Sequence, residues 1–310
     1  MSAATAAVLH VAAAFRPRTK LGERMSRHTS WHVGGPAQLY FSPRDRGDLA
    51  AFLRGLPADT EVHWIGLGSN LLVRDGGLPG VAIATQSALG RLERASAAVV
   101  YCEAGIACAR LARQCIEWGL GPAEFFGGIP GTLGGALAMN AGAFGGETWP
   151  HVVEVETIDR QGHEHTRSPS EYEVGYREVR PKVPGEGFLA ARLRFEVGSG
   201  ASAAALRSLL EQRKASQPIG EWSCGSVFRN PPGDHAARLI ETAGLKGLTV
   251  GDASVSEKHA NFIVNHGAAT AADIEQLIAR VSAEVERVHG VRLVPEVRIV
   301  GTAAAPGPRS

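Results

Sequence analysis

The transition from strand to loop near residue 65 constrains the fold more than any other feature of the chain. Residues 61–65 have the composition of a strand, and they run directly into Gly66-Leu67-Gly68-Ser69-Asn70. Because glycine has no Cβ, such a loop presents successive main-chain N–H groups to a ligand at close range. A concave set of N–H groups binds a phosphate by hydrogen bonds and dipoles. The pattern therefore predicts a strand-led fold with a phosphate-binding loop.

Three further runs of unusual composition follow this loop. They are Gly128-Ile129-Pro130-Gly131-Thr132-Leu133-Gly134-Gly135, Gly225-Ser226-Val227-Phe228-Arg229-Asn230-Pro231 and Pro295-Glu296-Val297-Arg298. Two glycine-rich runs, one hydroxyl on a tight loop and one late carboxylate indicate a phosphate-bearing cofactor beside a proton-transfer site. The alternative for the glycine runs is a pair of structural turns, since glycine-rich turns are common.

The usual nucleotide-binding and hydrolase signatures are absent from the sequence. No Gly-x-Gly-x-x-Gly follows a strand, which excludes the Rossmann fingerprint. No Gly-x-x-x-x-Gly-Lys-Ser/Thr occurs, which excludes P-loop NTPases, and no Gly-x-Ser-x-Gly elbow is present. A dinucleotide that binds here must therefore be held by a different fold.

Composition excludes several classes of partner. The 310 residues include 32 basic and 31 acidic side chains, so no basic field for nucleic acid or an anionic membrane is expected. No run of 18 apolar residues occurs, and the N-terminus lacks the order of a secretory signal. Cys102, Cys108, Cys115 and Cys224 form no Cys-x-x-Cys pair, and no histidine cluster has metal-ligand spacing. We therefore expect a cytoplasmic protein without a metal site.

Periodicity predicts an α+β organisation with a boundary near residue 198. The expected helices are 45–56, 106–118, 203–215, 235–243 and a long helix between Thr270 and Gly290; the expected strands are 39–41, 61–65, 81–85, 99–103, 152–159, 188–197, 261–265 and 291–300. The run Asp159-Arg160-Gln161-Gly162 is expected to form the turn of a hairpin. The expected domains are an N-terminal extension (1–25), a strand-rich domain of two subdomains (26–197), a smaller α+β domain (198–301) and a flexible tail (302–310).

The ordered set of motifs resembles one enzyme family. Thr29-Ser30-Trp31-His32-Val33-Gly34-Gly35, the second glycine run with Met139-Asn140-Ala141-Gly142, Tyr176-Arg177, the Ser226 run, Lys258-His259-Ala260-Asn261-Phe262 and Pro295-Glu296-Val297 occur in that order. The chain is similar, over roughly residues 27–300, to the UDP-N-acetylenolpyruvoylglucosamine reductase (MurB) family of peptidoglycan synthesis. One such motif is moderately specific, and the ordered set is very specific.

The resemblance implies a fold and an activity. The fold is an N-terminal FAD-binding region of the vanillyl-alcohol-oxidase (PCMH) type with a C-terminal substrate domain. The activity is reduction of UDP-N-acetylglucosamine enolpyruvate to UDP-N-acetylmuramate, in which non-covalent FAD accepts hydride from NADPH and passes it on from flavin N5. The implied partner is the UDP-sugar alone, and a monomer is expected. Membrane and nucleic acid are not expected as partners.

The resemblance also assigns roles to residues. Arg177 is expected to bind the substrate carboxylate, since a guanidinium does so bidentately, with Glu296, protonated or hydrogen-bonded, as the second catalytic group and Ser226 as proton donor. The residues expected to bind FAD are Gly66, Gly68, Ser69, Asn70, Gly128, Pro130, Gly131, Thr132, Gly134, Gly135, Asn140 and Gly142. Those expected to bind the sugar nucleotide are Tyr176, Arg213, Arg229 and Asn230. No metal ligand is expected.

The sequence departs from the family pattern at a few positions. The family often shows Tyr-Arg-x-Ser, whereas Tyr176-Arg177 continues here as Glu178-Val179, so the helper serine is absent. Ten residues separate Arg177 from Phe188, which resembles the shorter type II branch. Arg229 stands where lysine is frequent, and His32 stands where arginine is common. Of these departures, the absent serine bears on how Arg177 is positioned.

Two other functions remain open from the residues. A flavin-linked oxidase on the same N-terminal fold would use oxygen and would not need Ser226. A non-catalytic protein that senses flavin or a UDP-sugar would bind without turnover. Taken singly, Ser226, Arg177 and Glu296 also have structural explanations as a loop serine, a surface ion pair and a charge at a strand end. His259 and Asn261 are as consistent with a structural role as with a functional one.

Overall fold

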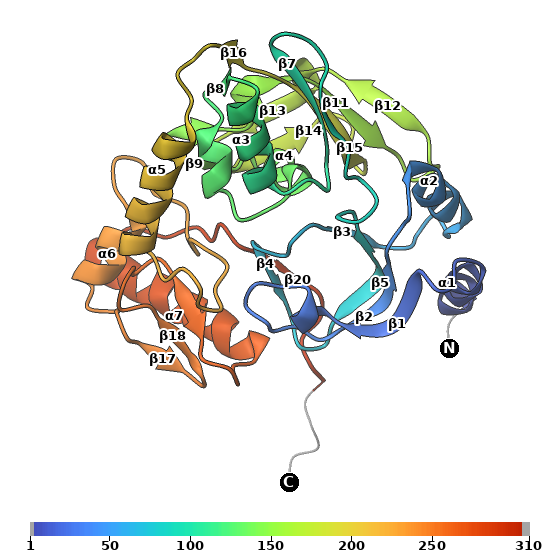
Figure 1. Cartoon of the computed structure of the whole chain (residues 1–310). Coiled ribbons are helices and arrows are strands. Elements are labelled where there is room, and N and C mark those ends of the chain that lie inside the picture. Colours follow the sequence, from blue (N-terminus) through green and yellow to red (C-terminus); the bar gives the residue numbers. More distant parts are fainter. Residues whose placement is uncertain (1–2, 306–310) are drawn as a thin grey trace. The chain divides into compact units, whose positions relative to one another are not determined.

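The computed structural model describes residues 3–305, which divide into two compact units (Figure 1). The first unit contains residues 1–21, 39–67 and 80–211, and the second contains 22–38, 68–79 and 212–310, in each case as far as the structure describes them. The expected boundaries after residues 25 and 197 therefore do not coincide with the ends of these units. Each unit has its own core and is described by itself.

The first unit contains most of the strands. Among the described elements, four begin in one unit and end in the other, namely β1 (Thr19–Arg24), β2 (Pro36–Phe41), β5 (Leu78–Ala84) and α5 (Ala203–Ser216). Its helices are α1 (Ala3–Ala14), α2 (Arg46–Gly55), α3 (Cys108–Glu117), α4 (Leu133–Met139) and α5 (Ala203–Ser216). Its strands are β1 (Thr19–Arg24), β2 (Pro36–Phe41), β3 (Val62–Ile65), β5 (Leu78–Ala84), β6 (Leu92–Arg94), β7 (Val99–Glu103), β8 (Leu120–Gly121), β9 (Gly142–Ala143), β10 (Gly146–Glu147), β11 (Val152–Ile158), β12 (Glu164–Arg167), β13 (Tyr172–Gly175), β14 (Glu178–Pro181), β15 (Gly187–Arg194) and β16 (Glu196–Val197).

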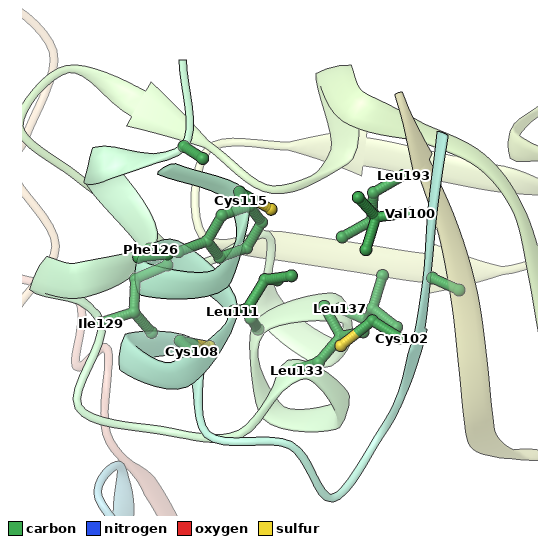
Figure 2. Close-up of a cluster of buried hydrophobic side chains, with 14 of the residues drawn as sticks. Val100, Cys102, Cys108, Leu111, Cys115, Phe126, Ile129, Leu133, Leu137 and Leu193 are labelled. Carbon is green, nitrogen blue, oxygen red and sulfur yellow. The ribbon is translucent and has the colours of Figure 1, made fainter. Parts of the chain in front are cut away.

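Two sheets organise this unit. A five-stranded antiparallel sheet has the order β12-β11-β15-β7-β6, and a four-stranded sheet has the order β1-β2-β5-β3 with β3 and β5 parallel. Helices α3 and α4 pack against the five-stranded sheet. Their leucines, Leu111, Leu133 and Leu137, form one apolar cluster with Val100 of β7 and Leu193 of β15 (Figure 2). A second apolar cluster joins α1 and α2 to the four-stranded sheet, where the rings of Phe41 and Phe52 stack 3.8 Å apart.

Cysteines fill part of the core of the first unit. Cys108 and Cys115 lie on the buried face of α3, as their spacing predicts, and Cys102 of β7 belongs to the same cluster (Figure 2). Burial raises the pKa of the Cys108 and Cys115 thiols to about 12, so both stay protonated at neutral pH. All four cysteines of the chain, including Cys224 in the second unit, are free thiols.

The second unit is a small α+β assembly. Its helices are α6 (Ala236–Thr242) and α7 (Ala271–His289), and its strands are β4 (Leu71–Val73), β17 (Thr249–Val250), β18 (Ala253–Val255), β19 (Ile263–Asn265) and β20 (Arg298–Val300). Strands β17, β18 and β19 form an antiparallel meander that packs on α7, and β20 pairs parallel with β4. Trp31 is fully buried in the core of this unit and donates its indole N–H to the carbonyl of Ile263, 2.8 Å away.

Helix α7 follows its sequence signals at both ends. Thr270 caps its N-terminus in a capping box with Asp273, and Gly290 ends it in the left-handed region at φ 68°. Asp75 also accepts hydrogen bonds from the first two N–H groups of the helix, a contact that no sequence pattern indicates. The helical periodicity predicts an apolar stripe of Ile274, Leu277, Ile278, Val281, Val285 and Val288. The structure buries this stripe except at Val288, which is 43% exposed and does not belong to the core.

Several predicted strands are shorter than expected. The final strand, predicted over 291–300, is limited to β20, because Pro295 has no N–H to donate to a ladder. The strand predicted over 188–197 divides into β15 and β16, and β16 pairs with β8. The strand predicted over 261–265 begins only at Ile263.

The predicted tail is only partly within the described residues. Thr302 exchanges hydrogen bonds with Gly76 and Gly77, 2.9 and 3.0 Å long, so ordered structure continues past the point where the tail is expected to begin. Residues 306–310 lie outside the described residues. Among the helices that the structure describes, none is long and apolar enough to cross a membrane.

Candidate active site

Ser226 and Glu296 come from neighbouring paired segments of the second unit. The N–H groups of Glu296 and Val297 both donate to the carbonyl of Val227, at 2.7 and 3.4 Å, and the next residue forms an isolated antiparallel bridge with Pro295. Burial and, after it, the negative charge of Glu296 raise the pKa of the Cys224 thiol well above its ordinary value. Glu296 therefore lies close to the segment that carries Ser226.

The Ser226 hydroxyl is half-buried and makes no hydrogen bond with any residue in the described part of the chain. The structural alternative, a loop serine that bonds its own backbone, is therefore not observed. Gly225 precedes it at φ 82°, a left-handed conformation that favours glycine. A loop of this shape leaves the hydroxyl available to a ligand.

Asn70 connects the first glycine run to Glu296. Its side-chain amide donates to the carbonyl of Glu296 at 3.1 Å, and its own carbonyl accepts from the N–H of Arg298 at 3.1 Å. We call residues 225–231 the Ser226 loop. Asn70, Glu296 and this loop thus belong to one hydrogen-bonded group in the second unit. The sequence places Asn70 among the cofactor-binding residues, and the structure gives it this second contact.

The first glycine run has main-chain N–H groups that are suited to bind a phosphate. Over residues 3–305, the main-chain N–H groups of Leu67, Gly68 and Ser69 donate to no protein acceptor. A Cβ at Gly68, which has φ 64°, would stand 1.9 Å from the carbonyl oxygen of His28, and one at Gly66 would stand 2.8 Å from a side-chain oxygen. The glycines are therefore required by close packing, while three successive donors remain available to a pyrophosphate.

The second glycine run is a different kind of structure. Thr132 is the N-cap of α4, a helix that the periodicity does not predict, and its hydroxyl accepts from the N–H of Gly135 at 3.4 Å. The N–H groups of Leu133 and Gly134 donate to main-chain carbonyls at 2.8 and 2.9 Å, and that of Gly131 donates to another at 2.9 Å. These N–H groups therefore hold α4 in place and are not available to a phosphate.

The exposed surface of the second run lies at Pro130 and Gly135. A Cβ at Gly135 would meet only a hydroxyl oxygen, 3.9 Å away, whereas one at Gly134 would stand 3.0 Å from the Cβ of Ala104. At Gly128, a Cβ would stand 2.6 Å from two different side chains. Gly128 and Gly134 therefore serve packing, and Gly135 faces open space.

Arg177 is held by main-chain carbonyls of the first unit. Its two terminal nitrogens donate to the carbonyls of Asn140, at 3.3 Å, and Gly142, at 2.8 Å. Its backbone lies in the left-handed region at φ 57°, which costs a residue with a Cβ on the order of 1 kcal/mol. The guanidinium also lies over the ring of Tyr176, 5.1 Å from its centre. A strained backbone under a guanidinium that is held at two points is typical of a functional residue.

Asn140 organises the segment around Arg177. It caps α4 at φ 47°, is 2% exposed, and accepts a hydrogen bond from the N–H of Trp149 at 3.0 Å. Its amide donates to Glu147 at 2.9 Å and to the carbonyl of Gly175 at 3.1 Å. Because the side chain is buried and both of its amide protons are used, Asn140 positions other residues and has no side-chain donor left for a cofactor.

The residues expected to bind the sugar nucleotide occupy varied positions. Tyr176, between β13 and β14, is 47% exposed, so its ring does not pack in the core. Burial lowers the pKa of Arg213, whose Nε donates to Gln217 at 2.7 Å. Arg229 donates its main-chain N–H to a carbonyl 2.9 Å away, and the Asn230 side chain accepts from a main-chain N–H of α6 at 3.1 Å.

The structure thus gathers the predicted site residues into two groups. The group in the first unit is Arg177, Asn140, Gly142 and Tyr176, and the group in the second unit is Ser226, Glu296 and Asn70. Asn261, which the sequence leaves between structure and function, contacts the Ser226 loop directly. Among the described residues, no group of three or more His, Cys, Asp or Glu side chains could hold a metal ion.

Comparison with known proteins shows relatives that match almost the whole chain. A protein from Alkalilimnicola ehrlichii, named UDP-N-acetylenolpyruvoylglucosamine reductase, is 61% identical over 91% of this chain and 94% of its own length. One of the same name from Methylococcus capsulatus is 57% identical over 91% of this chain and 93% of its own length. This chain belongs to the UDP-N-acetylenolpyruvoylglucosamine reductase family.

Domain and structure comparisons agree with this family. A model of the reductase family's C-terminal domain matches residues 217–300, and a model of an FAD binding domain matches residues 37–168. The solved structure of the reductase from Thermus caldophilus superposes with a TM-score of 0.75 at 32% identity, covering 91% of this chain and 97% of the other. The predicted family and the predicted fold class, an α+β chain with an FAD-binding region and a C-terminal domain, are both confirmed.

Proposed function

We propose that this protein reduces the enolpyruvyl ether of UDP-N-acetylglucosamine enolpyruvate to the lactyl ether of UDP-N-acetylmuramate, a step in peptidoglycan precursor synthesis. The protein is an FAD-dependent oxidoreductase of the reductase family, and NADPH is the proposed electron donor. The observation that carries the site assignment is the 2.7 Å hydrogen bond from the Glu296 N–H to the Val227 carbonyl, since it pairs the segments of the two acid–base candidates.

FAD, when bound, supplies the two-electron chemistry that lets a nicotinamide and an enol ether react in turn. The available N–H groups of Leu67, Gly68 and Ser69 would bind its pyrophosphate. The other proposed cofactor residues, Gly66, Gly128, Pro130, Gly131, Thr132, Gly134, Gly135 and Gly142, shape the first unit around the cofactor. Of these, the exposed Gly135 has open space for direct contact.

Arg177 binds the substrate carboxylate in this proposal. Reduction of the enol ether builds negative charge on the carbon next to that carboxylate, and a cation fixed in advance stabilises this charge without further reorganisation. The carbonyls of Asn140 and Gly142 provide that fixation. They hold Arg177 in a chain that has Val179 at the position where the family often carries its helper serine.

Ser226 donates the proton to this carbon. Its hydroxyl has no protein partner within the described residues, so it is free to point at a bound substrate. A serine is a weak acid, and it can serve because the carbon that it protonates is strongly basic. Glu296, held in the adjacent segment, assists this transfer in its protonated or hydrogen-bonded form, since a bare carboxylate would oppose the developing negative charge.

The sugar nucleotide is bound by the remaining candidates. Arg213 and Arg229 contact the diphosphate, Asn230 contacts the nucleotide beside them, and Tyr176 offers an exposed ring to the ligand. The protein works as a monomer in the cytoplasm. Light scattering during size-exclusion chromatography tests the monomer, for which the expected mass is 32.6 kDa.

An anaerobic stopped-flow experiment on the purified holoenzyme tests the function. The visible absorbance of the flavin should bleach when NADPH is added and recover rapidly when UDP-N-acetylglucosamine enolpyruvate follows. Recovery with oxygen but not with this substrate would replace the reductase by an oxidase of the same fold. Binding of the substrate without any recovery would favour a non-catalytic binding protein.

A further inference from the structure

We propose that Asn261 is a positioning residue for Ser226, which rests on the proposed function and goes beyond it. Its side-chain Oδ1 accepts the N–H of Phe228 at 2.9 Å, and its Nδ2 donates to the carbonyl of Phe228 at 2.8 Å. Its main-chain carbonyl accepts the N–H of Val227 at 2.9 Å. These contacts fall on the two residues that directly follow Ser226.

The Asn261 amide takes the place of a neighbouring strand. A residue in a sheet can pair both its N–H and its C=O with a partner chain, and here one side-chain amide pairs both groups of Phe228. This explains why the predicted strand over 261–265 begins only at Ile263, since Asn261 pairs with the Ser226 loop through its side chain. Asn261 is 4% exposed, so water does not replace these bonds in the folded protein.

The opposite edge of the Ser226 loop is held by the Glu296 segment. The carbonyl of Val227 accepts the N–H groups of Glu296 and Val297, and Arg229 donates its N–H to the carbonyl of Val294 at 2.9 Å. Residues 227–229 are therefore fixed on both edges, and Asn261 supplies the edge that faces away from Glu296. Loss of its amide would free one edge and let the Ser226 hydroxyl move relative to the carbon that it protonates.

The test uses Asn261→Asp, which keeps the shape of the side chain and replaces the donor Nδ2. At neutral pH the new carboxylate would face the Phe228 carbonyl without a proton to share. We expect reoxidation of the flavin by UDP-N-acetylglucosamine enolpyruvate to slow by roughly 10- to 100-fold. Flavin reduction by NADPH should keep the wild-type rate, because that half-reaction needs no proton from Ser226.

The pH dependence separates positioning from general damage. As the pH falls, the introduced carboxyl takes up a proton and regains a donor for the Phe228 carbonyl, so the deficit in reoxidation should shrink. His259 is the titratable side chain in contact, with its Nδ1 accepting the N–H of Asn261 at 3.3 Å, and Glu296 and Cys224 flank the loop. Because wild type carries these groups as well, its own pH profile removes their contribution.

Asn265→Asp is the matched control. Asn265 is the last residue of β19, is also 4% exposed, and uses its amide on Trp31 and on the main chain of residues 267 and 269. This variant also buries a carboxylate, but the hydrogen bonds of its side chain do not reach the Ser226 loop. We expect it to lower stability without a selective loss of the second half-reaction.

Any one of three outcomes would overturn the proposal. The first is equal slowing of both half-reactions in Asn261→Asp, and the second is a deficit in reoxidation that does not change with pH. The third is the same selective deficit in Asn265→Asp. If Asn261→Asp does not retain flavin, hydrogen exchange of the wild-type protein decides. A rapidly exchanging Phe228 amide would contradict the proposed fixation of Phe228 by Asn261, and a protected amide would support it. Failure of wild type itself to be reoxidised by the substrate would overturn the proposed function instead.

Discussion

Asn140 and Asn261 are both buried, and each uses its side-chain amide on groups that hold a loop in place. The main-chain carbonyl of Asn140 also accepts a hydrogen bond from Arg177, and Asn261 fixes the segment that follows Ser226. By contrast, the Ser226 hydroxyl has no partner within the described residues. The two asparagines that hold loops in place by hydrogen bonds are thus distinct from Ser226, the residue proposed to transfer a proton.

Ser226→Ala should separate the two half-reactions. We expect flavin reduction by NADPH to be nearly unchanged, because it needs no proton from the loop. Reoxidation by the enolpyruvyl substrate should slow by roughly 10²- to 10⁴-fold, the usual contribution of a general acid. Anaerobic stopped-flow absorbance measures both rates on one sample. Equal losses in the two half-reactions would rule out Ser226 as the proton donor.

Glycine substitutions should separate packing from cofactor binding. A side chain at Gly68 would collide with the His28 carbonyl, so a valine there would damage the fold as well as any cofactor contact. Gly135 faces open space, and Gly135→Leu should therefore weaken FAD binding while the apoprotein keeps its stability. Flavin content after purification and thermal unfolding of the apoprotein are the measurements.

Gly134→Leu is the matched control for this variant. Its Cβ would stand 3.0 Å from the Cβ of Ala104 and 3.1 Å from the Ala104 carbonyl oxygen, and the rest of the leucine side chain has to fit beyond this contact, so we expect it to lower the stability of the apoprotein. Full flavin content in Gly135→Leu would mean that the exposed face of the second glycine run does not contact the cofactor.

The hairpin of β11 and β12 shows how an element can depend on one turn residue. Asp159 accepts the main-chain N–H groups of Gln161 and His163, at 2.8 and 2.9 Å, and contacts His165 at 2.8 Å. Burial acts to raise the pKa of Asp159, but these hydrogen bonds outweigh it and lower the pKa from 3.8 to about 2. The structure confirms the turn that the sequence predicts over residues 159–162.

Asp159→Ala should therefore destabilise the protein in a pH-dependent manner. The folded pKa lies below the unfolded value, so the carboxylate stabilises the fold above about pH 4 and loses this effect as the pH falls towards about 2. At neutral pH we expect the free energy of unfolding to fall by about 1 kcal/mol. Urea unfolding of wild type and variant over a pH series measures the difference. A difference that stays constant down to the lowest pH would contradict this account.

Long periodic elements are predictable from the sequence, and short ones are not. Helix α7 has an apolar stripe with a cap at each end, so its limits follow from local signals. Helix α4 escapes prediction because Gly134 and Gly135 are poor helix formers, and buried Leu133 and Leu137 stabilise it through packing.

In the candidate site, too, the sequence predicts some features and misses those that depend on tertiary structure. The motifs predict Ser226 and Arg177 as site residues, because each lies in a run of distinctive composition. The contact of Asn261 with Phe228 depends on tertiary structure, since 33 residues separate the two partners. Sequence spacing does not reveal such a contact.

At the scale of the whole molecule, the described part of the second unit is built from three separate stretches of chain, 22–38, 68–79 and 212–305. Its core contains Trp31 and Leu72 beside residues of α6 and α7, and β20 pairs with β4. The stretch that begins at residue 212 therefore does not contain the complete core of the second unit. The predicted boundary at residue 198 does not anticipate this, because Trp31 and Leu72 are remote in sequence from the helices on which they pack.

A fragment of residues 198–310 should not fold stably on its own. Without Trp31 and Leu72 it lacks two fully buried side chains of its core, and it also lacks the strand that pairs with β20. We expect no cooperative thermal transition and rapid reaction of Cys224 with a thiol reagent. In the full-length protein, burial raises the pKa of that thiol, and the reaction should be slow. A fragment with a cooperative transition and a protected Cys224 would show that the C-terminal stretch is self-sufficient.

The pairing of β20 with β4 also sets an order of events during protein synthesis. Leu71 of β4 pairs with Arg298 of β20, so most of the chain must be translated between these two partners. At typical elongation speeds this interval is on the order of tens of seconds. During that time Trp31 and Leu72 have left the ribosome without the helices that will cover them. A nascent chain that stops before residue 298 can therefore never complete the second unit, however well the first has folded.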